Sequence, residues 1–149
     1  MKAEIHAHLR AHNIEIPDDP DEAVNLYLGA LLIEKFDYWL ARGFDYTDNP
    51  QPPTPFARPS SEAAKKDAAY RAAFAKLDSD TKRTIKELLR ESLEGILFST
   101  LLTFDQTPAG KWKLQFRTKD MTARANPGRD YELHDDLYKW MDLFSKNKQ

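Results

Sequence analysis

Cysteine is absent from this chain of 149 residues, glycine occurs only five times, and no apolar run is long. The lack of cysteine excludes disulfide frameworks, thiolate zinc sites and cysteine nucleophiles. So few glycines disfavour a phosphate-cradling loop, and the sequence has no dinucleotide-binding, P-loop or nucleophile-elbow motif. A transmembrane helix needs roughly 20 apolar residues, and the first twelve residues lack the continuous apolar core of an export signal. We therefore expect a cytoplasmic protein with no membrane segment, no bound metal and no cofactor.

The composition is that of a globular protein, with 41% hydrophobic and 31% charged residues. The formal net charge is only −2, but the charge is unevenly distributed. Residues 1–50 contain ten acidic and four basic side chains, a local charge of −6. Residues 111–129 contain six basic side chains and one acidic side chain, a local charge of +5. Such asymmetry steers partners without determining the fold.

Two long segments have apolar residues at steps of three and four, which predicts helices. The first starts at Asp19, whose side chain can cap the helix, and Pro20 fits the first helical position. We expect this helix to bury a stripe that includes Trp39 and to end near Gly43.

The second long helix is expected from about residue 80 to Asp105. Its apolar stripe includes Ile96 and Leu101, and the residues 94–105 are predicted to form its buried half. Gly95 is expected to allow a close approach or a slight bend. Shorter helices are predicted at residues 3–12, after a serine cap at 60 or 61, and at residues 131–145.

Residues 111–117 alternate between apolar and polar side chains, which predicts a half-buried strand. Residues 121–125 can pair with it as a hairpin. The proline-rich segment 48–59 is interpreted as a connection inside one domain. Together these features predict a mainly α (α+β) fold: a single domain, residues 1–149, of four to five helices around a central pair, with a small hairpin and a closing helix.

Three groups of residues are candidates for function. Asp105, His134, Asp135 and Asp136 can meet near Trp112 as a general base or a cation site, although acids at a helix start also stabilise the helix. An acidic protein-binding surface is predicted at Asp18, Asp19, Asp21 and Glu22, and a nucleic-acid or anion surface at Lys111, Lys113, Arg117, Lys119 and Arg124.

His8 and His12 are one helical turn apart and can share a metal ion with a carboxylate. The sequence contains no HExxH motif and no second pair of ligands with clear spacing. We therefore interpret both histidines as incidental residues of an exposed terminal helix.

The C-terminal third resembles a pattern of small bacterial proteins, several of which are immunity proteins of polymorphic-toxin or contact-inhibition systems. The matching residues are the helix from Glu94 to Asp105, a strand, and then Leu133-His134-Asp135-Asp136-Leu137-Tyr138. Those proteins have a glycine pair after the aspartate, whereas this chain has Gln106-Thr107-Pro108. The resemblance implies a helical protein that neutralises a toxin.

We therefore expect a non-enzymatic protein-binding domain whose partner is another protein, such as a basic toxin. A small enzyme or metal-binding protein that uses Asp105, His134, Asp135 and Asp136 is the first alternative. A nucleic-acid-binding accessory protein that uses the basic hairpin is the second.

Overall fold

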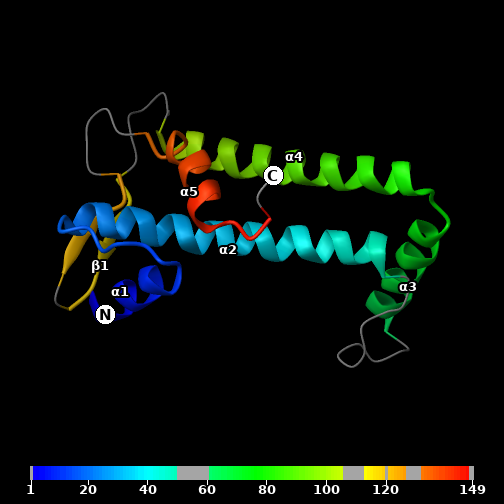
Figure 1. Ribbon diagram of the computed structural model, residues 1–149, viewed down its shortest axis with the longest axis horizontal. Coiled ribbons are helices and arrows are strands. Elements are labelled where there is room, and N and C mark those ends of the chain that lie inside the picture. Colours follow the sequence, from blue (N-terminus) through cyan, green and yellow to red (C-terminus); the bar gives the residue numbers. More distant parts are fainter. Residues whose placement is uncertain (1, 50–60, 106–112, 120, 127–131, 148–149) are drawn as a thin grey trace. The chain divides into compact units, whose positions relative to one another are not determined.

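The computed structural model describes residues 2–49, 61–105, 113–119, 121–126 and 132–147. Within these ranges the chain forms helices and one antiparallel hairpin (Figure 1): α1 (Lys2–Ala11), α2 (Pro20–Asp48), α3 (Glu62–Ala75), α4 (Ser79–Asp105), β1 (Gln115–Arg117), β2 (Thr122–Arg124) and α5 (Asp136–Phe144). This confirms the predicted mainly helical fold with a hairpin and a closing helix. None of the described helices is long and apolar enough to cross a membrane.

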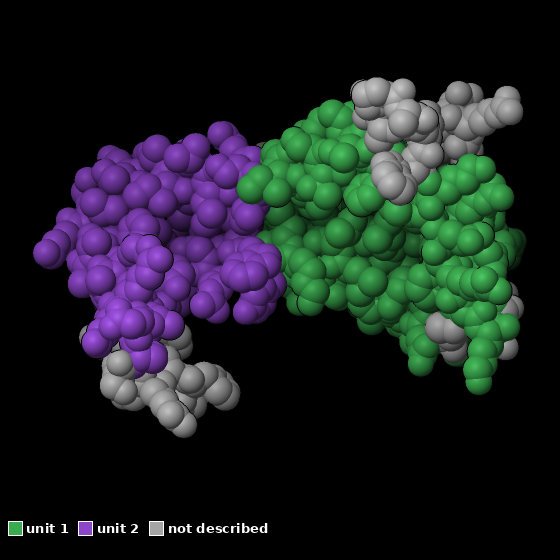
Figure 2. Space-filling model, turned by 180° about the vertical axis from the view of Figure 1, so that it is seen from behind, with its two compact units in different colours: residues 1–37, 95–149 green, residues 38–94 purple. Residues whose placement is uncertain are grey.

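The chain divides into two compact units, which Figure 2 shows in different colours. Unit 1 consists of residues 1–37 and 95–149, and unit 2 consists of residues 38–94. That both form one domain stays a prediction. Lys111, Trp112 and most of the proline-rich segment lie outside the described residues.

The core of unit 1 is built around α5. Trp140 is fully buried, and its ring lies directly against Gly29 of α2. Its indole Nε1 donates a hydrogen bond to the Oδ1 of Asn25 at 3.3 Å, and Asn25 Nδ2 donates to the carbonyl oxygen of Ala125 at 2.9 Å. One buried amide therefore joins α2, α5 and the end of the hairpin. Other fully buried side chains of this core are Leu9, Ile33, Leu133 and Leu137.

The hairpin has the predicted alternation. Phe116 is half-buried and pairs with the buried Ala123, while Gln115 and Arg117 on either side of Phe116 are exposed. The main-chain N–H of Arg124 donates to a side chain of α2, which attaches the hairpin to that helix.

α2 starts as predicted but ends later. The Asp19 carboxylate accepts a hydrogen bond from the N–H of Asp21 at 2.9 Å, and Pro20 is the first helical residue. The predicted end near Gly43 is wrong, because the helix continues to Asp48. A side chain at Gly43 would collide with Leu89, so this glycine permits close packing within unit 2 instead of ending the helix.

Arg71 of α3 explains why α2 can continue. Its guanidinium is buried and donates to the main-chain carbonyls of Asp45 at 3.1 Å and Asn49 at 2.8 Å. The carbonyls of a last helical turn lack partners inside the helix, and a cation there also complements the helix dipole. Arg71 therefore caps α2 from another helix.

α4 is less buried than the sequence predicts. Leu101 is buried, but Ile96 is 65% exposed and a side-chain carbon at Gly95 would meet nothing within 4 Å. Ser99, Thr100 and the neighbouring polar positions face solvent. The prediction that residues 94–105 form a buried half was wrong, because only one side of this helix packs on the core of unit 1.

α5 begins at Asp136, so the predicted start at residue 131 is wrong. Residues 133–135 form turns, in which the N–H of Asp136 donates to the carbonyl of Leu133 at 3.2 Å. Three side chains of this helix face the core and are buried: Leu137, Trp140 and Phe144.

Candidate functional site

Asp105 and His134 meet in unit 1. The buried Asp105 is the last residue of α4, and its Oδ2 accepts hydrogen bonds from the main-chain N–H and the ring Nδ1 of His134, both at 2.9 Å. Its Oδ1 is also buried and has no hydrogen-bond partner among the described residues. The pair ties the end of α4 to the turn that precedes α5.

The other ring nitrogen of His134 faces two further carboxylates. Its Nε2 lies 3.4 Å from Glu132 Oε2 and 3.6 Å from Asp135 Oδ1, and the ring edge packs on Phe98. Because a carboxylate only accepts hydrogen bonds, Asp105 favours the tautomer with a proton on Nδ1 and a lone pair on Nε2. This arrangement can accept a proton or bind a cation. The sequence did not predict that Glu132 belongs to this group of residues.

Asp136 lies elsewhere, because one of its carboxylate oxygens accepts a hydrogen bond from Asn25 Nδ2 at 3.0 Å. Of the four residues predicted to form a group, Asp105, His134 and Asp135 lie close together. Trp112, predicted to lie near them, is outside the described residues.

The four acids near the start of α2 have different surroundings. Asp19 caps the helix, and Asp21 Oδ1 accepts the hydrogen bond from the main-chain N–H of Arg124 at 2.8 Å. Glu22 and Asp18 are exposed. Two of the four acids therefore have structural contacts as well as charge.

The basic hairpin presents its cations to solvent. All its described candidates are exposed, namely Lys113, Arg117, Lys119 and Arg124, and Lys111 lies outside the described residues. Phe116, by contrast, is half-buried, and its ring makes a T-shaped contact with the ring of Tyr27.

Two aromatic side chains of α2 are exposed in unit 2. Tyr38 and Trp39 are each 55% exposed, and their rings meet edge to face at 5.3 Å between centroids. The guanidinium of Arg42 lies 5.9 Å from the Trp39 ring centroid, and its hydrogen bond with Tyr38 is the main cause of its raised pKa. The prediction that Trp39 belongs to the buried stripe was wrong. We call Tyr38, Trp39 and Arg42 the α2 aromatic cluster.

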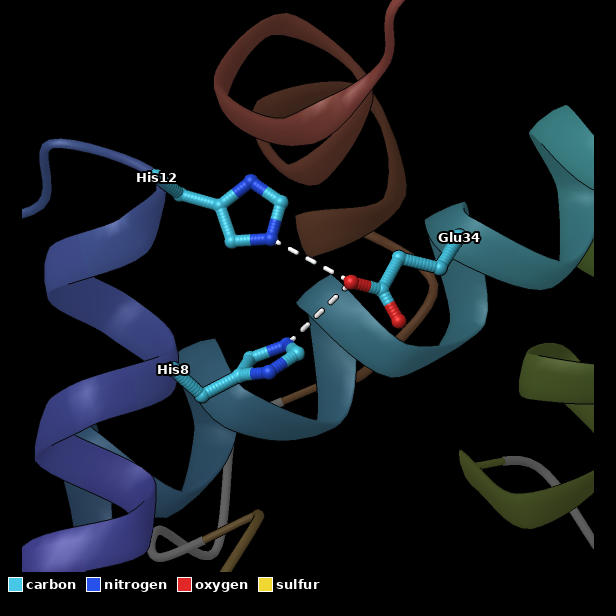
Figure 3. Close-up of side chains that lie close together, drawn as sticks. All are labelled: His8, His12 and Glu34. Carbon is cyan, nitrogen blue, oxygen red and sulfur yellow. Dashed lines mark hydrogen bonds and ion pairs between the residues drawn. The ribbon is translucent and has the colours of Figure 1, made fainter.

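His8 and His12 also differ from their prediction, because they are partly buried against α2 (Figure 3). Their Nε2 atoms lie 3.5 and 3.4 Å from the same oxygen, Glu34 Oε1. The i, i+4 spacing was visible in the sequence, whereas Glu34 carries no local signal that links it to them. Only the packing of α1 on α2 brings the three residues together.

A small apolar cavity lies between α2 and the hairpin. Its volume is about 210 Å³, below the roughly 300 Å³ at which pockets for organic ligands begin. Its lining includes the side chains of Tyr27, Leu31, Leu114 and Phe116 and the polar residue Gln115.

Comparisons with known proteins identify no relative: no model of a protein family, no curated protein and no solved structure matches this chain.

Proposed function

We propose that this chain is a non-enzymatic protein that binds another protein, and that the α2 aromatic cluster is the centre of the binding surface. The supporting observation is the exposure of Tyr38 and Trp39 beside Arg42. Tryptophan, tyrosine and arginine are the residue types most enriched among the side chains that dominate binding energy at protein interfaces.

The energetics favour a bound partner. Burying the exposed half of two such rings removes on the order of 200 Å² from water, or roughly 5 kcal/mol at about 25 cal/mol per Å². The Tyr38 and Trp39 rings are in edge-to-face contact, and the guanidinium of Arg42 lies 5.9 Å from the Trp39 ring centroid. Side chains ordered in advance lose less entropy on binding, so more of this energy contributes to affinity.

Two features support a basic toxin as the partner: the charge of the chain, and the pattern by which its C-terminal third resembles immunity proteins. Residues 1–50 have a local charge of −6, and Asp18 and Glu22 are exposed near the start of α2. Such a surface attracts a basic partner and raises its association rate. A basic toxin, such as a nuclease, has this charge, and its neutralisation is the activity we propose.

The test is to co-express the chain with the product of each gene next to its own and to measure toxicity, co-purification and Kd. For a partner found this way, Trp39→Ala is expected to raise Kd by at least about 30-fold, because a central aromatic anchor is lost. The control is Tyr138→Ala, since Tyr138 is similarly exposed (62%) but lies on α5.

An unchanged Kd for Trp39→Ala, with far-UV circular dichroism as in the wild type, contradicts the proposed surface. Protection from no neighbouring product contradicts toxin neutralisation. Reversing the charges of Asp18 and Glu22 tests whether they contribute to binding. Asp19 and Asp21 are less suitable for this test, because their side chains also accept hydrogen bonds that hold the start of α2 and the hairpin.

A further inference from the structure

We propose that His8, His12 and Glu34 bind one divalent transition-metal ion of the zinc class, which fastens α1 to α2. Figure 3 shows both imidazoles pointing from α1 toward the carboxylate on α2. This site is separate from the α2 aromatic cluster and does not depend on the proposed function.

The distances fit a tetrahedral ion. Zinc bonds to imidazole nitrogen and carboxylate oxygen at about 2.0–2.1 Å, which places neighbouring ligand atoms of a tetrahedron roughly 3.4 Å apart. Glu34 Oε1 lies 3.5 Å from His8 Nε2 and 3.4 Å from His12 Nε2, and the three atoms all lie within 4.8 Å of one another. Small side-chain rotations complete the geometry.

The His8 ring supplies an independent observation. Its Nε2 is buried and makes no hydrogen bond to any described residue, although Glu34 Oε1 is within ion-pair distance. A buried polar atom without a partner costs free energy, and natural proteins rarely leave one. A metal ion between His8 and Glu34 provides the missing partner.

The surrounding side chains hold the rings in position. The ring of His8 packs edge to face on Tyr27 and that of His12 on Phe144, each at 5.2 Å between centroids. Leu9, between the two histidines in the sequence, is fully buried and anchors α1 to the core. Ligands held on packed helices lose little freedom when they bind an ion.

The donor set selects the metal class. Two imidazoles and one carboxylate suit zinc, whereas calcium and magnesium prefer oxygen ligands. Three protein ligands leave a fourth position for water or for a ligand from outside the chain. Leu9 follows the first histidine where helical zinc hydrolases have a glutamate base, so the inference is of binding and not of hydrolysis.

A second group with suitable spacing, Glu132, His134 and Asp135, is the competing location. It offers a single imidazole, and Asp135 is largely exposed. Because imidazole is a better zinc ligand than an exposed carboxylate, we assign the ion to the site with two histidines.

The experiment uses the full chain without an affinity tag, stripped of metal by a chelator. Titration with zinc chloride is expected to show one ion per chain with a Kd below about 10 μM, and magnesium chloride no binding. Zinc at 100 times its Kd is expected to raise the Tm by roughly 5–10 °C, because the ion binds the folded chain. Cobalt(II) is expected to show the visible absorption of a tetrahedral site.

Matched variants locate the ion. His12→Gln and Glu34→Gln are each expected to weaken zinc binding at least about 100-fold, while His6→Gln on the same helix and His134→Gln leave it unchanged. Circular dichroism without zinc confirms that each variant is folded. The inference is overturned if the wild type binds no zinc, or if His134→Gln abolishes binding and His12→Gln does not.

Discussion

Single buried polar side chains determine how several parts of this protein are attached. Arg71, 3% exposed, donates from Nη2 to Asp45 Oδ2 at 2.6 Å and from Nε to Asp67 Oδ2 at 3.0 Å, besides its two main-chain carbonyls. Its guanidinium also lies over the Tyr46 ring at 4.6 Å. Every nitrogen of this guanidinium therefore has a partner, which is the condition under which a buried charge is tolerated.

Replacing Arg71 with alanine is expected to lower the free energy of unfolding by about 2–3 kcal/mol. The carbonyls of Asp45 and Asn49 each lose a hydrogen bond from Arg71, although Asp45 keeps the one from the N–H of Asn49. Two carboxylates lose their counter-charge. Arg83→Ala is the control, because Arg83 is 68% exposed and pairs with Asp80 on the same helix, so its loss is expected to cost less than about 0.5 kcal/mol. Urea denaturation measures the free energy of unfolding of both variants. An equal loss of this free energy in the two variants would contradict the capping role of Arg71.

At the scale of elements, the helices differ in how closely they approach their neighbours. The Gly29 position of α2 is filled by the rigid, fully buried Trp140 ring, whereas the Gly95 position of α4 faces open space. The sequence predicted a close approach or a slight bend at Gly95 and made no prediction for Gly29. Glycine inside a helix is costly unless a neighbour needs the room, and only the packing shows which neighbour does.

Gly29→Ala and Gly95→Ala are expected to change stability in opposite directions. Alanine at position 29 collides with Trp140, which is expected to cost about 1–3 kcal/mol. Alanine at position 95 meets no atom and improves helix propensity, which is expected to add about 0.5–1 kcal/mol. Thermal unfolding of the two variants beside the wild type measures this, and destabilisation by Gly95→Ala would contradict the open surroundings of α4.

At the scale of the whole molecule, stability depends on pH through its carboxylates. The hydrogen bond from the Tyr46 hydroxyl lowers the pKa of Asp67, and Arg71 contributes in the same direction. The N–H of Thr81 likewise lowers the pKa of the capping residue Asp78. A carboxyl whose pKa is lower in the folded chain stabilises the fold above its ordinary pKa of about 3.9. This stability is lost as the pH falls through the folded pKa.

The Tm is therefore expected to fall below about pH 4, and Asp67 is expected to contribute to that fall. Asp67→Asn is expected to be about 1–2 kcal/mol less stable than the wild type at pH 6, with a difference that shrinks toward pH 2.5. Asp142→Asn, at an exposed position of α5, is the control. Denaturation curves across this range measure both variants, and a difference independent of pH would contradict the role of the Asp67 charge.

The local sequence by itself determined the kinds of element and several of their ends. Asp19 and Pro20 mark the start of α2, Ser61 caps α3, and the alternation around Phe116 marks the hairpin. These signals depend on neighbours within a few residues, because capping and amphipathic period are properties of a short stretch of chain.

Tertiary structure alone decided which side chains meet. His12 and Glu34 are 22 residues apart, and Asp105 and His134 are 29 apart. Trp39 is exposed although it follows the apolar period, and α2 passes Gly43 because Arg71 caps it from another helix. Periodicity indicates that a helix has an apolar side, but the rotation and register of one helix against another depend on how all the side chains pack together. The candidate metal site and the exposed aromatic cluster are consequences of that packing.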